Sequence, residues 1–241
     1  MICKKIKTPA NIAWSPSQHK SLIAAGTSQG LINDDFQSFS KLEIFSANNT
    51  QQQALVSIPT SSSFSCLAWG AVDQGSTPMG LICGGTDDGS LSVWNPSLVL
   101  DSATEQPLSA IPEKDFSRVA QFDSENLSPT VVAFGNGEQS HSIAVASSSG
   151  EHISIFDLQS LGEAASLPIR ELPSSRQLAS RVKSGVEALR WNKRVPQILA
   201  VGNSNGSTVI WDLRHNKIAM ALKAKSFLPF RNYNKIFCEI K

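Results

Sequence analysis

The sequence predicts an all-β protein built from four similar sheets, and two observations lead to this expectation. The first is a hairpin signal in residues 197–214, where two runs of apolar and β-branched residues flank Asn205-Gly206. Asn-Gly supplies the two positive φ angles of a type I′ turn, so this stretch is expected to be a β-hairpin. The second observation is that the pattern of this stretch occurs three more times upstream.

Each unit begins with a short apolar strand that ends in an aromatic residue, followed by two further strands around a turn. The opening aromatic residues are Trp14, Trp69, Phe134 and Trp191, spaced 55, 65 and 57 residues apart. The last unit ends in Trp211-Asp212, the dipeptide that marks a blade of a WD-repeat propeller. The predicted fold is therefore an incomplete WD-repeat β-propeller of about four blades.

The blades are expected near residues 10–58, 64–122, 130–172 and 186–222. This spacing exceeds the roughly 40 to 45 residues of a usual WD blade, and the excess is assigned to polar loops. The loops are expected at 27–40, 97–115 and 162–184, and the outermost strands at 118–122, 167–172 and 217–222.

The two ends of the chain differ from the repeats. Residues 2–8 are expected to form an outer strand that closes the ring. Residues 223–241 contain no repeat pattern, and three interpretations stay open for them: an added strand, an aromatic peptide for a partner, or the misread end of a longer gene product. Residues 1–222 are thus the predicted partial propeller.

Aromatic residues recur at equivalent positions in the units, which favours a core between blades over a cage around one ligand. These structural anchors are Trp14, Trp69, Trp94, Phe134, Phe156, Trp191 and Trp211. The following Asp212 is expected to end its strand by accepting hydrogen bonds from backbone amides.

The composition and motifs favour no enzymatic or nucleic-acid function. Lys and Arg number 21 against 20 Asp and Glu, so a concentrated basic face for nucleic acid is not expected. The chain contains no G-x-x-x-x-G-K-[ST] loop, its four histidines are dispersed, and its four cysteines form no C-x-x-C pair. Asp87 and Asp88 are expected to form a turn. We therefore expect no catalytic residue, cofactor, metal ion or small-molecule substrate.

Residues 1–14 have no apolar signal-peptide core, and no run of 18 apolar residues occurs in the chain. The expectation is a cytoplasmic protein without a membrane span.

Several segments resemble one WD-repeat family, the large outer-coat subunit of COPII vesicles (Sec31). The segments are Ala13-Trp14-Ser15-Pro16, Ala24 to Ser28 with the following insert and Leu42 to Phe45, Leu67 to Gly70, Gly80 to Pro96, and Leu189 to Arg214. The resemblance covers residues 1 to about 222. It implies a seven-bladed propeller, of which this chain has about four blades.

By resemblance, the expected function is scaffolding in the outer COPII coat, in transport from the endoplasmic reticulum to the Golgi. The implied partners are other coat subunits, namely the smaller outer-coat propeller protein and the inner coat. The implied location is the cytoplasmic side of endoplasmic-reticulum exit sites, peripheral to the membrane. Two alternatives are a generic WD-repeat adaptor that binds a peptide or protein on its propeller face and, less favoured, an enzyme on a small four-bladed propeller.

Overall fold

The computed structural model describes residues 9–16, 21–28, 31–32, 38–48, 53–71, 77–101, 107, 118–123, 129–137, 140–147, 152–168, 185–204 and 206–223. These residues form four antiparallel sheets, which we name blades 1 to 4 in chain order. Three parts of the sequence-based expectation lie outside the described residues: the closing strand at 2–8, residues 224–241 of the tail, and Asn205 of the predicted turn.

Blade 1 has five strands and each of the other blades has four. Blade 1 contains β1 (Ala10–Trp14), β2 (Leu22–Thr27), β3 (Leu31–Ile32), β4 (Ser38–Ser46) and β5 (Val56–Thr60). Blade 2 contains β6 (Phe64–Gly70), β7 (Leu81–Thr86), β8 (Ser90–Trp94) and β9 (Arg118–Asp123), with one 3-10 turn, η1 (Pro96–Leu98), after β8. Blade 3 contains β10 (Pro129–Phe134), β11 (Ser142–Ser147), β12 (His152–Asp157) and β13 (Gly162–Pro168). Blade 4 contains β14 (Val186–Trp191), β15 (Ile198–Asn203), β16 (Ser207–Asp212) and β17 (Lys217–Lys223).

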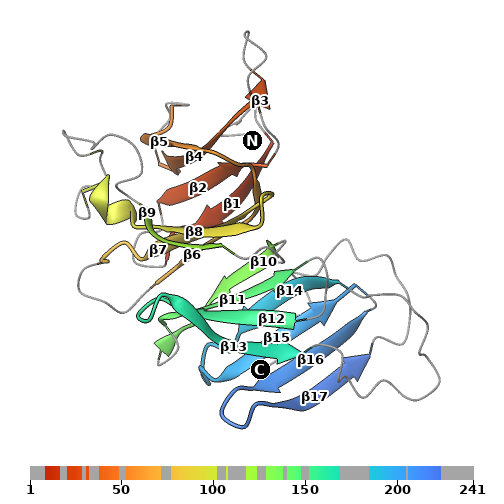
Figure 1. Cartoon of the computed structure of the whole chain (residues 1–241). Coiled ribbons are helices and arrows are strands. Elements are labelled where there is room, and N and C mark those ends of the chain that lie inside the picture. Colours follow the sequence, from red (N-terminus) through yellow and green to blue (C-terminus); the bar gives the residue numbers. More distant parts are fainter. Residues whose placement is uncertain are drawn as a thin grey trace.

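The first strands of successive blades lie next to one another. β6 contacts β1 on one side and β10 on the other, and β10 in turn contacts β14 (Figure 1). Within blades 2 to 4 the strands pair in sequence order, so each chain segment runs from this inner line outward. This is the arrangement of blades in a β-propeller.

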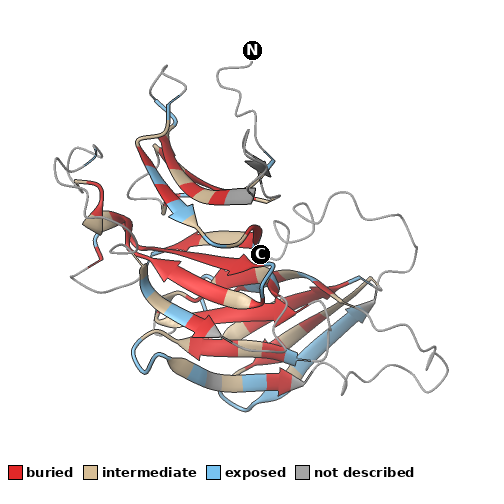
Figure 2. Ribbon diagram, turned by 45° about the horizontal axis from the view of Figure 1, so that its top comes forward, coloured by how far each residue is buried: buried red, intermediate tan, exposed pale blue. Residues whose placement is uncertain are grey.

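Three clusters of buried side chains fill the three spaces between blades. One joins Leu22 and Ile44 of blade 1 to Phe64 of blade 2, and a second joins Cys83 of blade 2 to Ile143 of blade 3. The third extends from blade 3 to blade 4 and contains Trp191 and Trp211. Figure 2 shows buried residues in each of the four sheets. The core therefore lies between the blades rather than inside any one of them.

Glycines permit the close contact between blades 1 and 2. A Cβ atom added to Gly26 would lie 2.6 Å from the Phe64 ring, and one added to Gly84 would lie 2.5 Å from the same ring. The Phe64 ring is thus held between a glycine of blade 1 and a glycine of its own blade. On its remaining side the ring lies 5.6 Å from the Trp94 ring, measured between centroids.

The outer strand of blade 3 differs from the sequence-based expectation. β13 covers Gly162–Pro168, whereas residues 162–184 were expected to be a loop and the strand was expected at 167–172. The reason is the turn before it, where Leu161 has φ of 53°. Asn216 has φ of 46° at the equivalent turn of blade 4. Asn is a common residue in this left-handed conformation and Leu is not, so the turn in blade 3 has no sequence signal.

In blade 1, β4 begins earlier than expected and pairs with a short additional strand. The polar segment 27–40 was assigned to a loop, but it contains β3 and the first residues of β4, which pair through Leu31 with Phe39 and Ile32 with Ser38. The β2–β4 hairpin is therefore extended by a short additional pair of strands.

Gly26→Ala should lower the free energy of unfolding by about 1–3 kcal/mol, because the added methyl group overlaps a ring that has no space to move. The measurement is urea unfolding followed by tryptophan fluorescence. Gly162→Ala is the matched control, since the nearest atom to its added Cβ is 4.0 Å away. Equal stability of the two variants would contradict the proposed packing constraint.

Leu161→Asn should raise the free energy of unfolding by about 1 kcal/mol, because Asn tolerates a positive φ better than Leu. Leu161 is 57% exposed, so little packing is lost. The reciprocal variant Asn216→Leu should lower stability by a similar amount. Thermal and urea unfolding would measure both effects, and no change in either variant would show that the turns carry no backbone strain.

Candidate interaction surface

The predicted anchor residues lie in the spaces between blades, with one exception. Trp69 and Trp191 are buried, and their indole Nε1–H groups donate to the carbonyls of Met79 (2.8 Å) and Ala133 (3.1 Å). Phe156 packs against Phe122 with ring centroids 4.8 Å apart. Trp94 and Trp211 are buried, and Phe134 is half-buried beside Gly70. The structure thus distributes these residues over three interfaces and does not bring them to one site.

Trp14 is the exception, because it is 57% exposed. It shares the outward face of β1 with Ile12, which is 60% exposed, and no other blade of the described chain packs on this face. The expected burial of Trp14 is therefore not met within the described residues. The equivalent aromatic residues of blades 2 to 4 are covered by the blade that precedes each of them.

Asp212 is held in a turn. Its carboxylate accepts hydrogen bonds from the amide of Arg214 (3.0 Å) and from the Arg214 guanidinium (3.0 and 2.9 Å), and its Oδ2 lies 3.1 Å from Nδ1 of His215. The Arg214 side chain holds the pKa of Asp212 well below its usual range. Asp157 and Asn95 make the same contact to the second following amide at the equivalent positions of blades 3 and 2. The role of Asp212 is thus to form the turn after its strand.

Polar side chains join the inner strands of successive blades. Asn11 donates to the carbonyl of Phe64 (2.7 Å), Ser65 to that of Pro129 (2.5 Å), and Thr130 to that of Val186 (3.4 Å). Ser65 and Thr130 occupy irregular positions in the pairing of β6 and β10 with their neighbours. This seam contributes to the contact between successive blades.

The thiols of the described residues are unsuited to catalysis. Cys66 and Cys83 are buried and form no disulfide. Burial raises the pKa of Cys66 to about 11 and the pKa of Cys83 well above its ordinary value, so both remain neutral thiols at neutral pH. In the same described part of the chain, no three His, Cys, Asp or Glu residues are grouped so that they could hold a metal ion.

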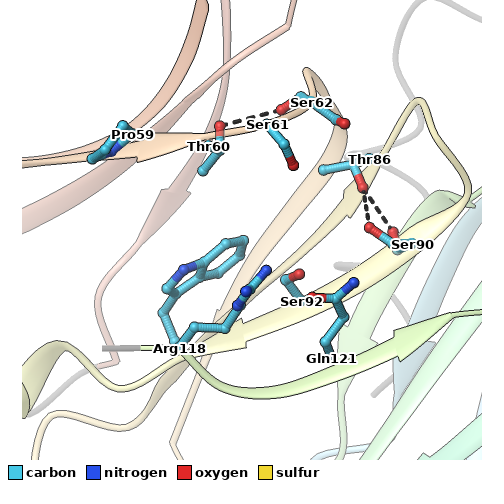
Figure 3. Close-up of a pocket in the computed structure, with 10 residues that line it drawn as sticks. Pro59, Thr60, Ser61, Ser62, Thr86, Ser90, Ser92, Arg118 and Gln121 are labelled. Atoms are coloured by element: carbon cyan, nitrogen blue, oxygen red, sulfur yellow. Dashed lines mark hydrogen bonds between the residues drawn. The ribbon is translucent and has the colours of Figure 1, made fainter. Parts of the chain in front are cut away.

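Within the described ranges, two open sheet faces and one pocket are places where a partner could bind. Blade 1 exposes Ile12 and Trp14, and the last strand of blade 4 exposes Met220 (54%) and Leu222 (46%). The pocket has a volume of about 300 Å³ and lies between the outer parts of blades 1 and 2 (Figure 3). It is lined by Pro59, Thr60, Ser61, Ser62, Thr86, Ser90, Ser92, Trp94, Arg118 and Gln121. Sequence reasoning missed this pocket, because its residues carry no motif.

One edge of the pocket is organised by Asp88, in the turn between β7 and β8. Its carboxylate accepts hydrogen bonds from Ser62 Oγ (2.6 Å), Thr86 Oγ1 (2.7 Å) and the amide of Ser90 (2.9 Å). Partial burial raises the pKa of Asp88, but these hydrogen bonds outweigh it and lower the pKa to about 2. Gly89 follows with φ of 88°, so Asp88-Gly89 forms the turn. Asp88 thus connects the end of blade 1 to blade 2.

The fold and the recurring turn residues define the class of protein, a WD-repeat β-propeller. Among proteins of this class, the chain is similar to Sec31 protein transport proteins. The chain is 34% identical over 231 residues to SEC31 of Mycosarcoma maydis, and the aligned region covers 90% of this chain and 15% of that protein. It is 31% identical over 234 residues to Sec31B of Mus musculus, covering 94% of this chain and 18% of that protein. The chain is therefore homologous to Sec31 over most of its own length and spans less than a fifth of these relatives.

Solved structures support the fold. A chain in a structure described as "COPII on membranes, outer coat vertex" superimposes with a TM-score of 0.63 at 22% identity, covering 90% of this chain and 50% of that one. A chain in a structure of the COPII coat assembled on membranes has the same TM-score and identity. No protein-family profile matches the sequence. No helix of the described residues has the length and apolar character needed to cross a membrane.

Asp88→Asn should reduce the loss of stability at acid pH. The folded-state pKa of about 2 lies below the unfolded value of 3.8, so the carboxylate stabilises the fold above about pH 4. This contribution disappears as the pH falls from about 4 towards 2. Urea unfolding at pH 6, 4 and 2.5 should show a steeper decrease for the parent than for the variant. Asp87→Asn is the control, because it removes a carboxylate of the same turn and keeps the three hydrogen bonds; a parent-like pH profile for Asp88→Asn would contradict the assignment.

Proposed function

We propose that the chain is a protein–protein scaffold of the outer layer of the COPII coat, acting in transport from the endoplasmic reticulum to the Golgi. The observation that carries the proposal is homology to Sec31 over about nine tenths of the chain. The structural likeness to a COPII outer-coat vertex supports the fold on which this role depends. The proposed location is the cytoplasmic side of endoplasmic-reticulum exit sites, peripheral to the membrane.

The proposed partners are other COPII coat subunits, including the smaller outer-coat propeller protein and the inner coat. We place this function in residues 1–222 as part of a seven-bladed propeller, with 2–8 as its closing strand and 223–241 outside the repeats. Two features of the described residues suit a scaffold. First, the blades are joined by buried apolar clusters and by the hydrogen bonds of Asn11, Ser65 and Thr130. Second, blades 1 and 4 each leave an apolar face exposed, with Trp14 on one and Met220 on the other, against which a further blade or partner could pack.

The chemistry of the described side chains supports the proposal of a non-catalytic role. The buried thiols stay protonated, and the most strongly shifted carboxylates, Asp88 and Asp212, have their oxygens occupied by turn hydrogen bonds. A general base or nucleophile needs an accessible atom beside its substrate. We therefore propose that the chain acts by binding and not by turnover.

Affinity purification of the chain, tagged at its own locus, should enrich COPII coat subunits by about tenfold or more over a WD-repeat chain of similar size from a non-coat protein. Quantitative mass spectrometry of the cross-linked complexes is the measurement. Enrichment of a different partner set without coat subunits would overturn the coat role and favour the generic WD-repeat adaptor. Conversion of many molecules of a small-molecule substrate per molecule of the purified chain would overturn the scaffold role.

A further inference from the structure

The geometry points to an interaction surface on the open face of blade 4 that holds residues 224–241 of the same chain, with Lys235 beside Glu187 and Glu239 beside Arg190. The open face is the side of β14 to β17 that no other described sheet covers, and blade 4 is the last sheet of the row (Figure 1). The inference does not rest on the coat role, because it concerns contacts within one chain. A further blade or partner at this face would displace the segment.

The open face of blade 4 is mainly apolar. The strand register places two rows of cross-strand partners on it: Arg190, Ala200, Ile210 and Met220, and Ala188, Gly202, Thr208 and Leu222. The residues between these rows, such as Val201 and Val209, are buried against blade 3. Met220 is 54% exposed and Leu222 is 46% exposed. A contiguous exposed apolar surface of this kind marks an interaction site.

Glu187 interrupts the hydrogen-bonded seam that joins successive blades. Asn11, Ser65 and Thr130 each donate to a carbonyl of the next blade's first strand. Glu187 occupies the equivalent position in blade 4, because it lies at the same irregular step in the pairing of its strand as Ser65 and Thr130. A carboxylate accepts hydrogen bonds and cannot donate them. The seam position of blade 4 therefore requires a donor from whatever covers it, and not a carbonyl.

Arg190 is the second difference between blade 4 and the earlier blades. The residue before the anchor aromatic is Ala13, Ala68 or Ala133 in blades 1 to 3, and each packs in the cluster shared with the next blade. Blade 4 has the exposed Arg190 at this position. Among the described residues, neither Arg190 nor Glu187 has a side-chain hydrogen bond or ion pair. The face thus presents an unpaired cation and an unpaired anion where earlier blades have a small residue and a donor.

A second copy of the chain does not fit these two charges. Its own open face is that of blade 1, whose first strand begins at Ala10. The carbonyls that accept the seam hydrogen bonds belong to the first residues of β6, β10 and β14. Continuing the seam would therefore place the carbonyl of Ala10 opposite Glu187. Two acceptors form no hydrogen bond, so the match is worse than between blades of one chain.

Residues 224–241 begin at this face and carry complementary charge. The segment follows directly on β17, the strand that contains Met220 and Leu222. Its 18 residues span up to about 60 Å when extended, whereas a sheet of four strands is about 14 Å across. The segment contains four Lys or Arg residues and one Glu, while residues 1–223 contain 17 Lys or Arg against 19 Asp or Glu. Reach and charge therefore favour this segment as the occupant.

The charged residues of the segment determine the pairing. Glu239 is its single acid, so it is the partner of Arg190. Lys235, Phe237 and Glu239 alternate with other residues, so they share one face of an extended chain. Lys235 and Glu239 are then about 13 Å apart, close to the roughly 10 Å between Glu187 and Arg190 along β14. This arrangement places Lys235 at Glu187 and the Phe237 ring against the apolar rows.

The test uses the ε-methyl signal of Met220 in the 241-residue chain labelled with methyl-¹³C methionine. The chain has three methionines, and the Met220 signal is identified by its loss in Met220→Leu. A soluble gadolinium chelate speeds the relaxation of methyl groups that it can approach. Glu187→Lys should at least double this effect at Met220, because repulsion of Lys235 releases the segment. The signal of Met79, which is buried, should stay unchanged and shows that the variant is folded.

A charge exchange and a matched control complete the test. Adding Lys235→Glu to Glu187→Lys should restore the parent relaxation of Met220. Glu163→Lys makes the same charge change at an exposed site of β13 and should behave like the parent. The proposal is overturned by a Met220 signal that Glu187→Lys leaves unchanged, by a double variant without recovery, or by protection that disappears on tenfold dilution, which would indicate a second copy. These samples contain no coat subunit, so their result is separate from the affinity purification that tests the coat role.

Discussion

The close approach of neighbouring sheets is the constraint on which the rest of the structure depends. Packed sheets lie about 10 Å apart, so an aromatic ring between them needs a partner with little volume. Phe64 has this space because Gly26 and Gly84 carry no side chain, and Phe134 has it because of Gly70. Each blade therefore buries its faces only when a neighbour with a complementary pattern is present. Stability is shared between adjacent blades, as in other repeat proteins.

This division of stability explains how the chain tolerates long connections. Most residues of the blade-to-blade clusters belong to strands, and Met79, Val99 and Leu100 are buried residues between strands. Insertions away from these residues leave the packed faces unchanged. The residues that stabilise the fold therefore differ from those that a partner can reach. Trp191 and Val201 are buried in the packing between blades, whereas residues at the outer edges of blades are exposed.

The pocket beside Arg118 shows how one repeat can acquire a separate chemistry. Val209, Trp211 and Ile218 of blade 4 illustrate the apolar arrangement of the outer strands. In blade 2, Ser92, Trp94 and Arg118 stand at the same positions and leave a polar cavity. The inner strands of both blades begin with a buried residue and keep a buried tryptophan, Trp69 or Trp191, at the equivalent position. A propeller can thus carry a local polar cavity without disturbing the contacts that hold its blades together.

The sequence by itself determined the all-β repeat, the four units and most of the anchor positions, because turn residues and aromatic spacing are local properties of the chain. The tertiary structure alone decided that Trp14 is exposed, since burial of its face depends on which blade lies against it. It also decided the position of β13, because Leu161 adopts a conformation that its residue type does not indicate. The pocket belongs to this second group, since Ser62, Trp94 and Arg118 are distant in sequence and meet only when two blades are packed side by side.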